Sequence, residues 1–370
     1  MRFTLWRVGR SAKAHDASRK PRSAEATPGT DDGRVRHQLQ TAAGQMVKQA
    51  QTRMRTRLWP ARKRLARPSS GLRILFYHRV ADDPTDLLTV TCEVFEGEMS
   101  LLAERGYEVL DVVSALDRLY DGELEPRTVA LTFDDGYVDN TENALPVLER
   151  FGFRGTVFVL GDLAATNDPF LPGSSAPLLS WDEIKRLDGV SPLSFEPHSL
   201  THPDLTRVSD AASWHEIHGS GSRLEAVLGR PKNVFCYPGG FAGAREREYV
   251  RASGYRYGIT TEPGVNHRST DRYLIRRIQM NQCDRVVDFA AKLEGSHDRP
   301  LLGRQIYRRF IYGAGNPLNR SAGPGAPLVL SDVSQAANRT QTESDRAGAG
   351  GVAEEPDGRP AGYVDQARPP

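Results

Sequence analysis

The sequence has few cysteines and no long apolar run. Its 370 residues include only Cys92, Cys236 and Cys283, which lie far apart. This spacing excludes a disulfide framework and a zinc cluster built from paired thiolates. No stretch reaches the roughly 18 consecutive apolar residues of a transmembrane helix, and the first residues lack the apolar core of a secretory signal. These absences predict a cytoplasmic protein in a reducing compartment, with peripheral attachment to a membrane as an alternative.

Large apolar residues are also scarce at both ends of the chain. Hydrophobic residues make up 38% of the sequence, while 34 glycines and 24 prolines interrupt it. Segments 13–33 and 316–370 are polar or rich in small residues and show no apolar periodicity. We therefore expect one domain at 71–312, a basic and mostly disordered arm at 1–70, and a disordered tail at 313–370.

The small net charge hides two segments of opposite sign. The whole chain has a formal charge of +2, yet residues 1–70 contain 17 Lys and Arg against 4 Asp and Glu. The other residues hold 32 basic and 43 acidic side chains. A basic arm could bind nucleic acid, but this arm has few aromatic residues among its charges and precedes an acidic domain. We therefore expect no nucleic-acid partner.

Part of the basic arm has a helical period. Between residues 34 and 58, apolar residues recur at helical spacing among Arg, Gln and Lys, and Pro60 is expected to end the helix. A solvated linker helix is one interpretation. Peripheral contact of residues 34–67 with an anionic membrane is the second. The third is that Met46 or Met54 is the true start of the protein.

From residue 72 onward, strand-like and helix-like segments alternate. Apolar segments typical of buried strands occur at 72–78, 109–112, 128–133, 155–160 and 233–237. Helical periodicity occurs at 95–105, 112–120, 141–151, 211–228 and in a segment that begins with a capping box at Ser180. This alternation predicts an α/β protein with a largely parallel sheet or barrel.

Two adjacent carboxylates follow one of these strands. Asp134 and Asp135 come directly after the apolar segment 128–133 and precede Gly136. The carboxyl ends of parallel strands are where α/β proteins build active sites. Adjacent carboxylates repel each other, so their pairing indicates a cation or a group with a shifted pKa, although a surface turn has the same sequence.

Histidines supply the other candidate metal ligands. His198 and His202 are spaced i, i+4, which on a helical turn places both imidazoles on one face. Two histidines and one carboxylate form a first shell for zinc or another divalent transition metal. His215 and His218 are a second pair, but they lie in a segment with the apolar period of a surface helix. We expect the second pair to be solvated.

A third candidate is the loop Cys236-Tyr-Pro-Gly-Gly240, which interrupts a strand-like segment. A turn of this composition can expose backbone N–H groups, and Gly239 is the donor that we expect to face an anionic intermediate. By itself the loop is an ordinary turn.

The three motifs together resemble the polysaccharide deacetylase family, the NodB-homology domain of carbohydrate esterase family four. The matching segments are Thr132-Phe-Asp-Asp-Gly-Tyr137, His198-Ser-Leu-Thr-His202 and Tyr237-Pro-Gly-Gly240, in the family's order. The resemblance covers roughly 72–295. It implies a deformed (β/α) barrel that removes N-acetyl groups from N-acetylhexosamine units of a glycan.

The resemblance also implies roles for individual residues. Asp134 would be the general base, Asp135, His198 and His202 the metal ligands, and the Gly239 N–H part of the oxyanion hole. Tyr237 and Pro238 would contact the substrate. The implied cofactor is a divalent metal, zinc first, with cobalt, nickel or manganese as alternatives, and the implied partner is an N-acetylated glycan.

Several positions depart from the family pattern. Cys236 stands where family members commonly have an arginine that orients the base, and Gly239 stands where a tyrosine is common. The fourth motif, an Asp and Trp pair, is not recognisable in 255–266. The fifth, a Leu-x-His pattern that supplies the general acid, is replaced near 274–280. The candidates for these missing groups are Arg276 or Arg277 as the orienting residue and His267 or His78 as the acid.

These departures resemble the branch of the family associated with the synthesis of exopolysaccharides and surface glycans. The sequence therefore predicts a metal-dependent carbohydrate N-deacetylase. The alternative is a glycan-binding protein that keeps the barrel but has lost the acid.

Overall fold

We describe the protein from a computed structural model that places residues 46, 49–61, 70–82, 88–162 and 176–298. The disorder expected for most of the arm and for the tail at 313–370 concerns residues outside these ranges. The same is true of residues 34–45 of the expected amphipathic helix.

The described strands are all paired in parallel. The largest sheet has the order β10-β1-β5-β6-β7, with β4 also paired to β5, and β8 pairs with β9. The strands of these two sheets are β1 (Arg73–Tyr77), β4 (Glu108–Leu110), β5 (Thr128–Phe133), β6 (Gly155–Val159), β7 (Leu193–Pro197), β8 (Val234–Cys236), β9 (Tyr257–Ile259) and β10 (Ile278–Gln279). Two short strands, β2 (Arg79–Val80) and β3 (Thr89–Val90), pair with each other.

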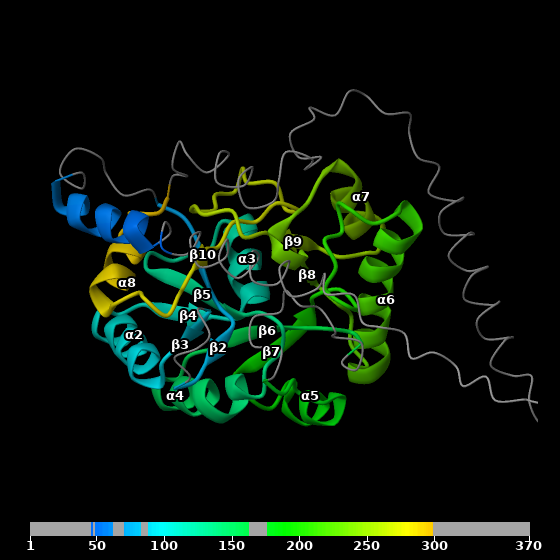
Figure 1. Cartoon of the computed structure of the whole chain (residues 1–370), viewed down its shortest axis with the longest axis horizontal. Helices are drawn as coiled ribbons and strands as arrows, with labels where there is room; N and C mark the ends of the chain where they lie inside the picture. Colours follow the sequence, from blue (N-terminus) through cyan, green and yellow to red (C-terminus); the bar gives the residue numbers. More distant parts are fainter. Residues whose placement is uncertain (1–45, 47–48, 62–69, 83–87, 163–175, 299–370) are drawn as a thin grey trace, which may run out of the picture. The chain divides into compact units, whose positions relative to one another are not determined.

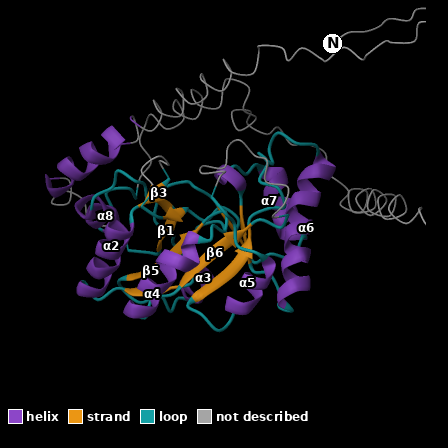
Figure 2. Cartoon of the chain, turned by 60° about the horizontal axis from the view of Figure 1, so that its bottom comes forward, coloured by secondary structure: helices purple, strands orange, loops and turns teal. Residues whose placement is uncertain are grey.

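Helices lie around these strands (Figures 1 and 2). They are α2 (Cys92–Glu104), α3 (Val112–Asp121), η1 (Asn140–Ala144), α4 (Leu145–Phe151), α5 (Trp181–Leu187), α6 (Asp210–Leu228), η2 (Pro238–Gly240), α7 (Ala244–Ala252) and α8 (Val286–Leu293). Strands covered by helices bury both faces, which explains why every residue of β5 is buried.

The two sheets are joined at both ends, so the strands form a deformed barrel. At one junction, Glu196 at the end of β7 accepts hydrogen bonds from the backbone N–H groups of Asn233 and Val234 at β8. At the other, Ile275 pairs with Ile259 of β9 just before the chain enters β10. The structure thus confirms the α/β fold and the deformed (β/α) barrel.

Most of the elements predicted from the sequence are present. The capping box of α5 forms as expected, because the Ser180 hydroxyl accepts the Glu183 N–H while the Glu183 carboxylate accepts the Ser180 N–H. Helix α2 begins three residues earlier than predicted, because Thr91 caps it. The short strands β9 and β10 and the helices α7 and α8 were not predicted.

A helix at 49–61 packs against the domain beside α8 (Figure 1). The Arg55 guanidinium donates to the Ser296 carbonyl at 3.1 Å, and the Trp59 indole donates to Glu294 Oε2 at 3.0 Å. Pro60 was expected to end the helix, and the described helix reaches residue 61, one residue beyond it. Within the part of the chain that the structure describes, no helix is both long and apolar enough to cross a membrane.

Four polar side chains are buried together between β1, α2 and α8. The Tyr77 hydroxyl donates to Glu98 Oε2 at 2.8 Å, and Lys292 Nζ donates to Asp284 Oδ2 at 2.5 Å. Glu98 is fully buried, and its Oε1 has no hydrogen-bond partner among the described residues. Burial raises the pKa of Glu98 to about 8, and the nearby Asp284 adds to this shift, while the Tyr77 hydrogen bond and Lys292 oppose it.

Glu98→Gln is expected to remove a pH-dependent loss of stability. Between the ordinary pKa of glutamate and the raised pKa of Glu98, the native state binds one proton more than the unfolded state, so its stability falls as pH rises. Above this window the loss is on the order of 5 kcal/mol. The amide keeps an acceptor for Tyr77, so the variant should gain stability over the original protein at about pH 8.5 and differ little at about pH 5.

Urea denaturation at the two pH values measures this difference. The exposed Glu93 of the same helix provides a matched Glu→Gln control. Equal pH slopes for the original protein and Glu98→Gln would contradict the argument.

Candidate active site

The two aspartates after β5 have different surroundings. Asp134 and Asp135 are both buried. Asp135 has a φ of 73°, in the left-handed region, so the chain turns sharply at this residue. Both Asp134 oxygens bind a guanidinium, whereas neither Asp135 oxygen has a hydrogen-bond partner among the described residues.

Arg277 holds Asp134 through a bidentate ion pair. Its Nη1 donates to Asp134 Oδ1 at 2.6 Å and its Nη2 donates to Oδ2 at 2.8 Å. The guanidinium has no exposed surface and lies 4.3 Å from the ring centroid of Phe76. Burial alone would raise the pKa of Asp134, but the charge of Arg277 outweighs it and lowers this pKa. Of the two candidate orienting residues, Arg277 therefore contacts Asp134, the expected base, while Arg276 is exposed.

Asp135, His198 and His202 form a compact cluster. His198 Nε2 lies 3.5 Å and His202 Nε2 3.7 Å from Asp135 Oδ1. Two ligands bound tetrahedrally to one zinc ion are about 3.4 Å apart, so these spacings suit a shared cation. Burial would raise the pKa of Asp135, but the neighbouring histidines, His198 and His202 foremost, hold it well below its usual range. The structure thus brings the three expected metal ligands together.

The helical turn predicted for the two histidines is wrong. Residues 198–202 form a loop after β7, and both Ser199 and His202 have positive φ, of 67° and 63°. The loop replaces the helix because its N–H groups bond side chains instead of preceding carbonyls, as when His202 N–H donates to Ser199 Oγ at 2.9 Å.

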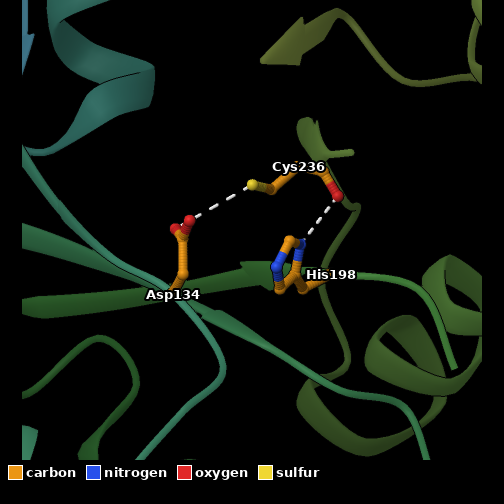
Figure 3. Close-up of side chains that lie close together, drawn as sticks. All are labelled: Asp134, His198 and Cys236. Atoms are coloured by element: carbon orange, nitrogen blue, oxygen red, sulfur yellow. Dashed lines mark hydrogen bonds between the residues drawn. The ribbon is translucent and has the colours of Figure 1, made fainter. Parts of the chain in front are cut away.

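A backbone carbonyl fixes the tautomer of His198. Its Nδ1 donates to the Cys236 carbonyl at 2.8 Å (Figure 3). Because a carbonyl only accepts hydrogen bonds, Nδ1 carries the hydrogen and the Nε2 lone pair faces Asp135. Burial would lower the pKa of His198, but the two aspartates and this carbonyl raise it in the absence of an ion.

Cys236 and Asp134 form a second possible ligand set with His198. The thiol lies 3.9 Å from Asp134 Oδ1 (Figure 3) and accepts a hydrogen bond from Arg277 Nη2 at 3.0 Å. Burial raises the pKa of this thiol well above its usual range. A protonated thiol and a carboxylate already paired with arginine are poor ligands, so the set with Asp135 and His202 fits a cation better.

The loop after β8 places Gly239 at the surface and the preceding residues in the core. Gly239 has a φ of 60°, and a Cβ there would lie 2.7 Å from the Phe241 ring, so a tyrosine does not fit this backbone. No hydrogen bond within the described residues uses its N–H. Tyr237 and Pro238 are buried, and the Tyr237 hydroxyl donates to the Tyr273 carbonyl at 3.2 Å. The side chains of Tyr237 and Pro238 therefore lie inside the protein, and the expected contact of these two residues with substrate stays a prediction.

The two candidate acids lie at opposite ends of the barrel. His78 directly follows β1, whose last residue pairs with Phe133, so it lies at the same edge as Asp134. Its charge lowers the pKa of both Asp134 and Asp135. His267 follows Asn266, which bridges to Leu72 at the start of β1. The structure therefore brings His78, and not His267, to the site.

The second histidine pair is solvated, as expected. His215 and His218 are exposed on α6, and His218 stacks on Trp214 with ring centroids 5.1 Å apart. Neither belongs to a cluster of three potential ligands within the described ranges. The glutamate between them, Glu216, is buried and bonds the loop that carries His198 and His202. Sequence analysis assigned it no role.

Comparison with known proteins identifies the class. The family model for polysaccharide deacetylases matches residues 121–258. The Bacillus subtilis protein YxkH, named as a polysaccharide deacetylase, is 27% identical over 211 residues, which are 57% of this chain and 71% of YxkH. The peptidoglycan-N-acetylmuramic acid deacetylase PdaA of the same organism is 27% identical over 161 residues, 43% of this chain and 54% of PdaA. The chain thus spans about half the length of PdaA.

Solved structures share the fold. The Streptococcus pyogenes deacetylase PplD, in complex with acetate, has a TM-score of 0.54 and 22% identity, covering 63% of this chain and 100% of PplD. IcaB from Ammonifex degensii has a TM-score of 0.53 and 21% identity, covering 61% and 98%. The match to the family model identifies residues 121–258 as polysaccharide deacetylase sequence, a class of hydrolases, and these solved structures share the fold of the domain.

Arg277→Ala is expected to destabilise the protein by about 3–5 kcal/mol, because it leaves the Asp134 carboxylate buried without a counter-charge. Urea denaturation in the presence of a chelator measures the loss. Adding Asp134→Asn to Arg277→Ala should recover part of it, since the unpaired charge is then gone. Arg276→Ala is the matched control and should cost less than about 0.5 kcal/mol. Equal losses for the two arginine variants would contradict the role given to the ion pair.

Proposed function

We propose that this protein is a metal-dependent N-deacetylase that releases acetate from N-acetylhexosamine units of a glycan. The observation that carries this proposal is a cluster of the buried Asp135 and His198 with the partly buried His202, beside a carboxylate that Arg277 keeps ionised. Among the relatives, PdaA and a Staphylococcus aureus poly-beta-1,6-N-acetyl-D-glucosamine N-deacetylase are named for N-acetylated glycans. The latter is 22% identical over 222 residues, 57% of this chain and 74% of its own length.

The ligand cluster fits a divalent metal. Both oxygens of Asp135 are buried without hydrogen bonds among the described residues, an expensive arrangement unless a cation satisfies them. Two imidazoles and one carboxylate favour zinc, with cobalt, nickel or manganese as alternatives. Such an ion polarises the acetamide carbonyl and makes a water molecule acidic enough to attack it.

Asp134 is the proposed general base. Its carboxylate takes a proton from the attacking water, and the Arg277 fork holds it ionised and correctly oriented for this transfer. Arg277 stands 41 residues from Cys236 in the sequence, yet it also reaches the Cys236 thiol. It thus fills the place of the arginine that is missing from the third motif.

His78 is the proposed general acid, and the Gly239 N–H the oxyanion donor. When the carbonyl–nitrogen bond breaks, the leaving amine needs a proton, and His78 lies at the same edge of the barrel as the base. Gly239 lies in the turn that follows β8. Its exposed N–H is close in sequence to Cys236, the last residue of β8, which contacts His198. The products are acetate and a free amine on the sugar.

The alternative function is a glycan-binding protein without catalysis. The sequence motif that supplies the acid in the family is absent, which favours that alternative. The position of His78 favours the enzyme, because this histidine follows β1 and lies at the same edge of the barrel as Asp134. Acetate release from N-acetylated oligosaccharides, with and without chelator, separates the two.

Two groups of variants should behave differently in that assay. Asp134→Asn and His78→Gln should keep stoichiometric zinc and lose turnover by about 10²–10⁴-fold, because each removes only a proton transfer. His198→Ala should lose both zinc and turnover. Metal analysis and acetate release are measured on the same samples, with His267→Gln as the control that changes neither. Zinc retained by His198→Ala, or a full rate after chelation, would contradict the proposed function.

The helix at 49–61 is the proposed membrane contact within residues 34–67. Its inner face is polar, while its exposed side combines apolar and basic residues. Arg53 and Arg57 are exposed there, and Met54 and Leu58 are each 49% exposed. Met46, which precedes this helix within residues 34–67, is 71% exposed. An apolar stripe beside arginines suits the surface of an anionic membrane. The cytoplasmic location of the protein stays a prediction.

Replacing Met54 and Leu58 together by glutamine should reduce binding of the full chain to phosphatidylserine vesicles several-fold, because the apolar part of the contact is lost. Sedimentation with the vesicles measures the bound fraction, which should also fall as salt screens the arginines. Val190→Gln changes an 82% exposed apolar residue elsewhere and serves as the control. Unchanged binding of the double variant would reject this contact.

A further inference from the structure

Glu216 binds Leu200 and Thr201, in the middle of the loop at 198–202 that carries His198 and His202. The carboxylate is 8% exposed and projects from the middle of α6. Its Oε2 accepts the N–H groups of Leu200 at 2.8 Å and Thr201 at 2.9 Å, and its Oε1 accepts the Thr201 hydroxyl at 2.6 Å. One side chain thus holds the middle of the loop through three hydrogen bonds.

The loop needs such support because its backbone is strained. Ser199 and His202 have φ values of 67° and 63°, in the left-handed region that is strained for non-glycine residues. A conformation of this kind persists only where the surroundings hold it in place. His202 is itself one of the strained residues, so any relaxation of the loop would move its imidazole relative to His198.

Helix α6 contacts the same loop a second time, through Leu200. A Cβ on Gly219 of α6 would lie 2.9 Å from a methyl group of Leu200, and a Cβ on Gly161 would lie 2.5 Å from the other methyl. The leucine side chain therefore occupies a space that exists only because both positions are glycine. The Glu216 hydrogen bonds and the packing of Leu200 against Gly219 thus both fix the position of the loop relative to α6.

We propose that Glu216 is a positioning residue that sets the affinity of the site for a divalent metal ion. It acts through Leu200 and Thr201 and fixes the separation of His198 and His202. The inference rests on the proposed metal role of the two histidines. It also explains why the motif His215-Glu-Ile-His218 has exposed histidines around a buried glutamate: the glutamate faces the loop, and the histidines face solvent.

The test is the affinity of the full chain for zinc, measured by competition with a chromophoric chelator. Glu216→Ala should weaken binding about 10–100-fold, the usual effect of losing a group that orients metal ligands. Glu216→Gln should recover most of the affinity, because its amide oxygen still accepts both N–H groups and its NH₂ can donate to the Thr201 hydroxyl. If Glu216 had a purely structural role, the loss of zinc affinity would instead accompany a loss of stability of the metal-free protein.

Glu225→Ala is the matched control. Glu225 lies on the same helix and bonds the Lys232 backbone and ammonium, away from the loop, so its loss should leave zinc affinity within about twofold. If Glu216→Ala does not fold, Thr201→Val carries the test, because it removes only the hydroxyl bond and should weaken zinc binding several-fold.

The possible outcomes separate this inference from the proposed function. Zinc affinity of Glu216→Ala, or of Thr201→Val in its place, equal to that of the original protein overturns the inference alone. Zinc binding by the original protein without acetate release overturns the proposed function alone. Absence of zinc binding by the original protein overturns both.

Discussion

The site depends on one buried ion pair, between Arg277 and Asp134. Two carboxylates stand side by side after β5, and only the motif resemblance, not their local pattern, gives them different expected roles. The guanidinium takes both oxygens of Asp134 and leaves those of Asp135 facing the imidazoles of His198 and His202. On the proposed function, the pair gives the two aspartates different tasks: Asp134 would be kept ionised to accept a proton, and Asp135 would be left for a cation.

The barrel makes this arrangement possible by bringing distant segments to one edge. Asp134 follows β5, His198 follows β7, and the Cys236 carbonyl that orients His198 ends β8. Arg277 directly precedes β10, and from there its side chain reaches Asp134, 143 residues away in the sequence. Such a pair is costly to bury, and bidentate geometry with additional bonds to Thr260 and Thr132 compensates for part of that cost.

Much of this could be predicted from the sequence, but not the partner of the base. Buried strands such as 128–133 and the capping box at Ser180 depend on local patterns, and the motif resemblance placed Asp134, Asp135, His198 and His202. The choice of Arg277 over Arg276, and of His78 over His267, depends on which strand ends lie next to each other in the barrel. A single sequence does not contain this information. The helical turn expected at His198 was wrong because loop N–H groups bond side chains, including that of Glu216.

The central claim is that Asp135 binds the cation and Asp134 does not. Its most direct test is the anomalous difference map of a crystal of the protein loaded with zinc. The account predicts one zinc ion with Asp135, His198 and His202 as ligands at about 2.0–2.2 Å, while Arg277 still holds Asp134. A zinc ion bound by Asp134 and Cys236, or Asp134 released from Arg277 to become a ligand, would contradict it.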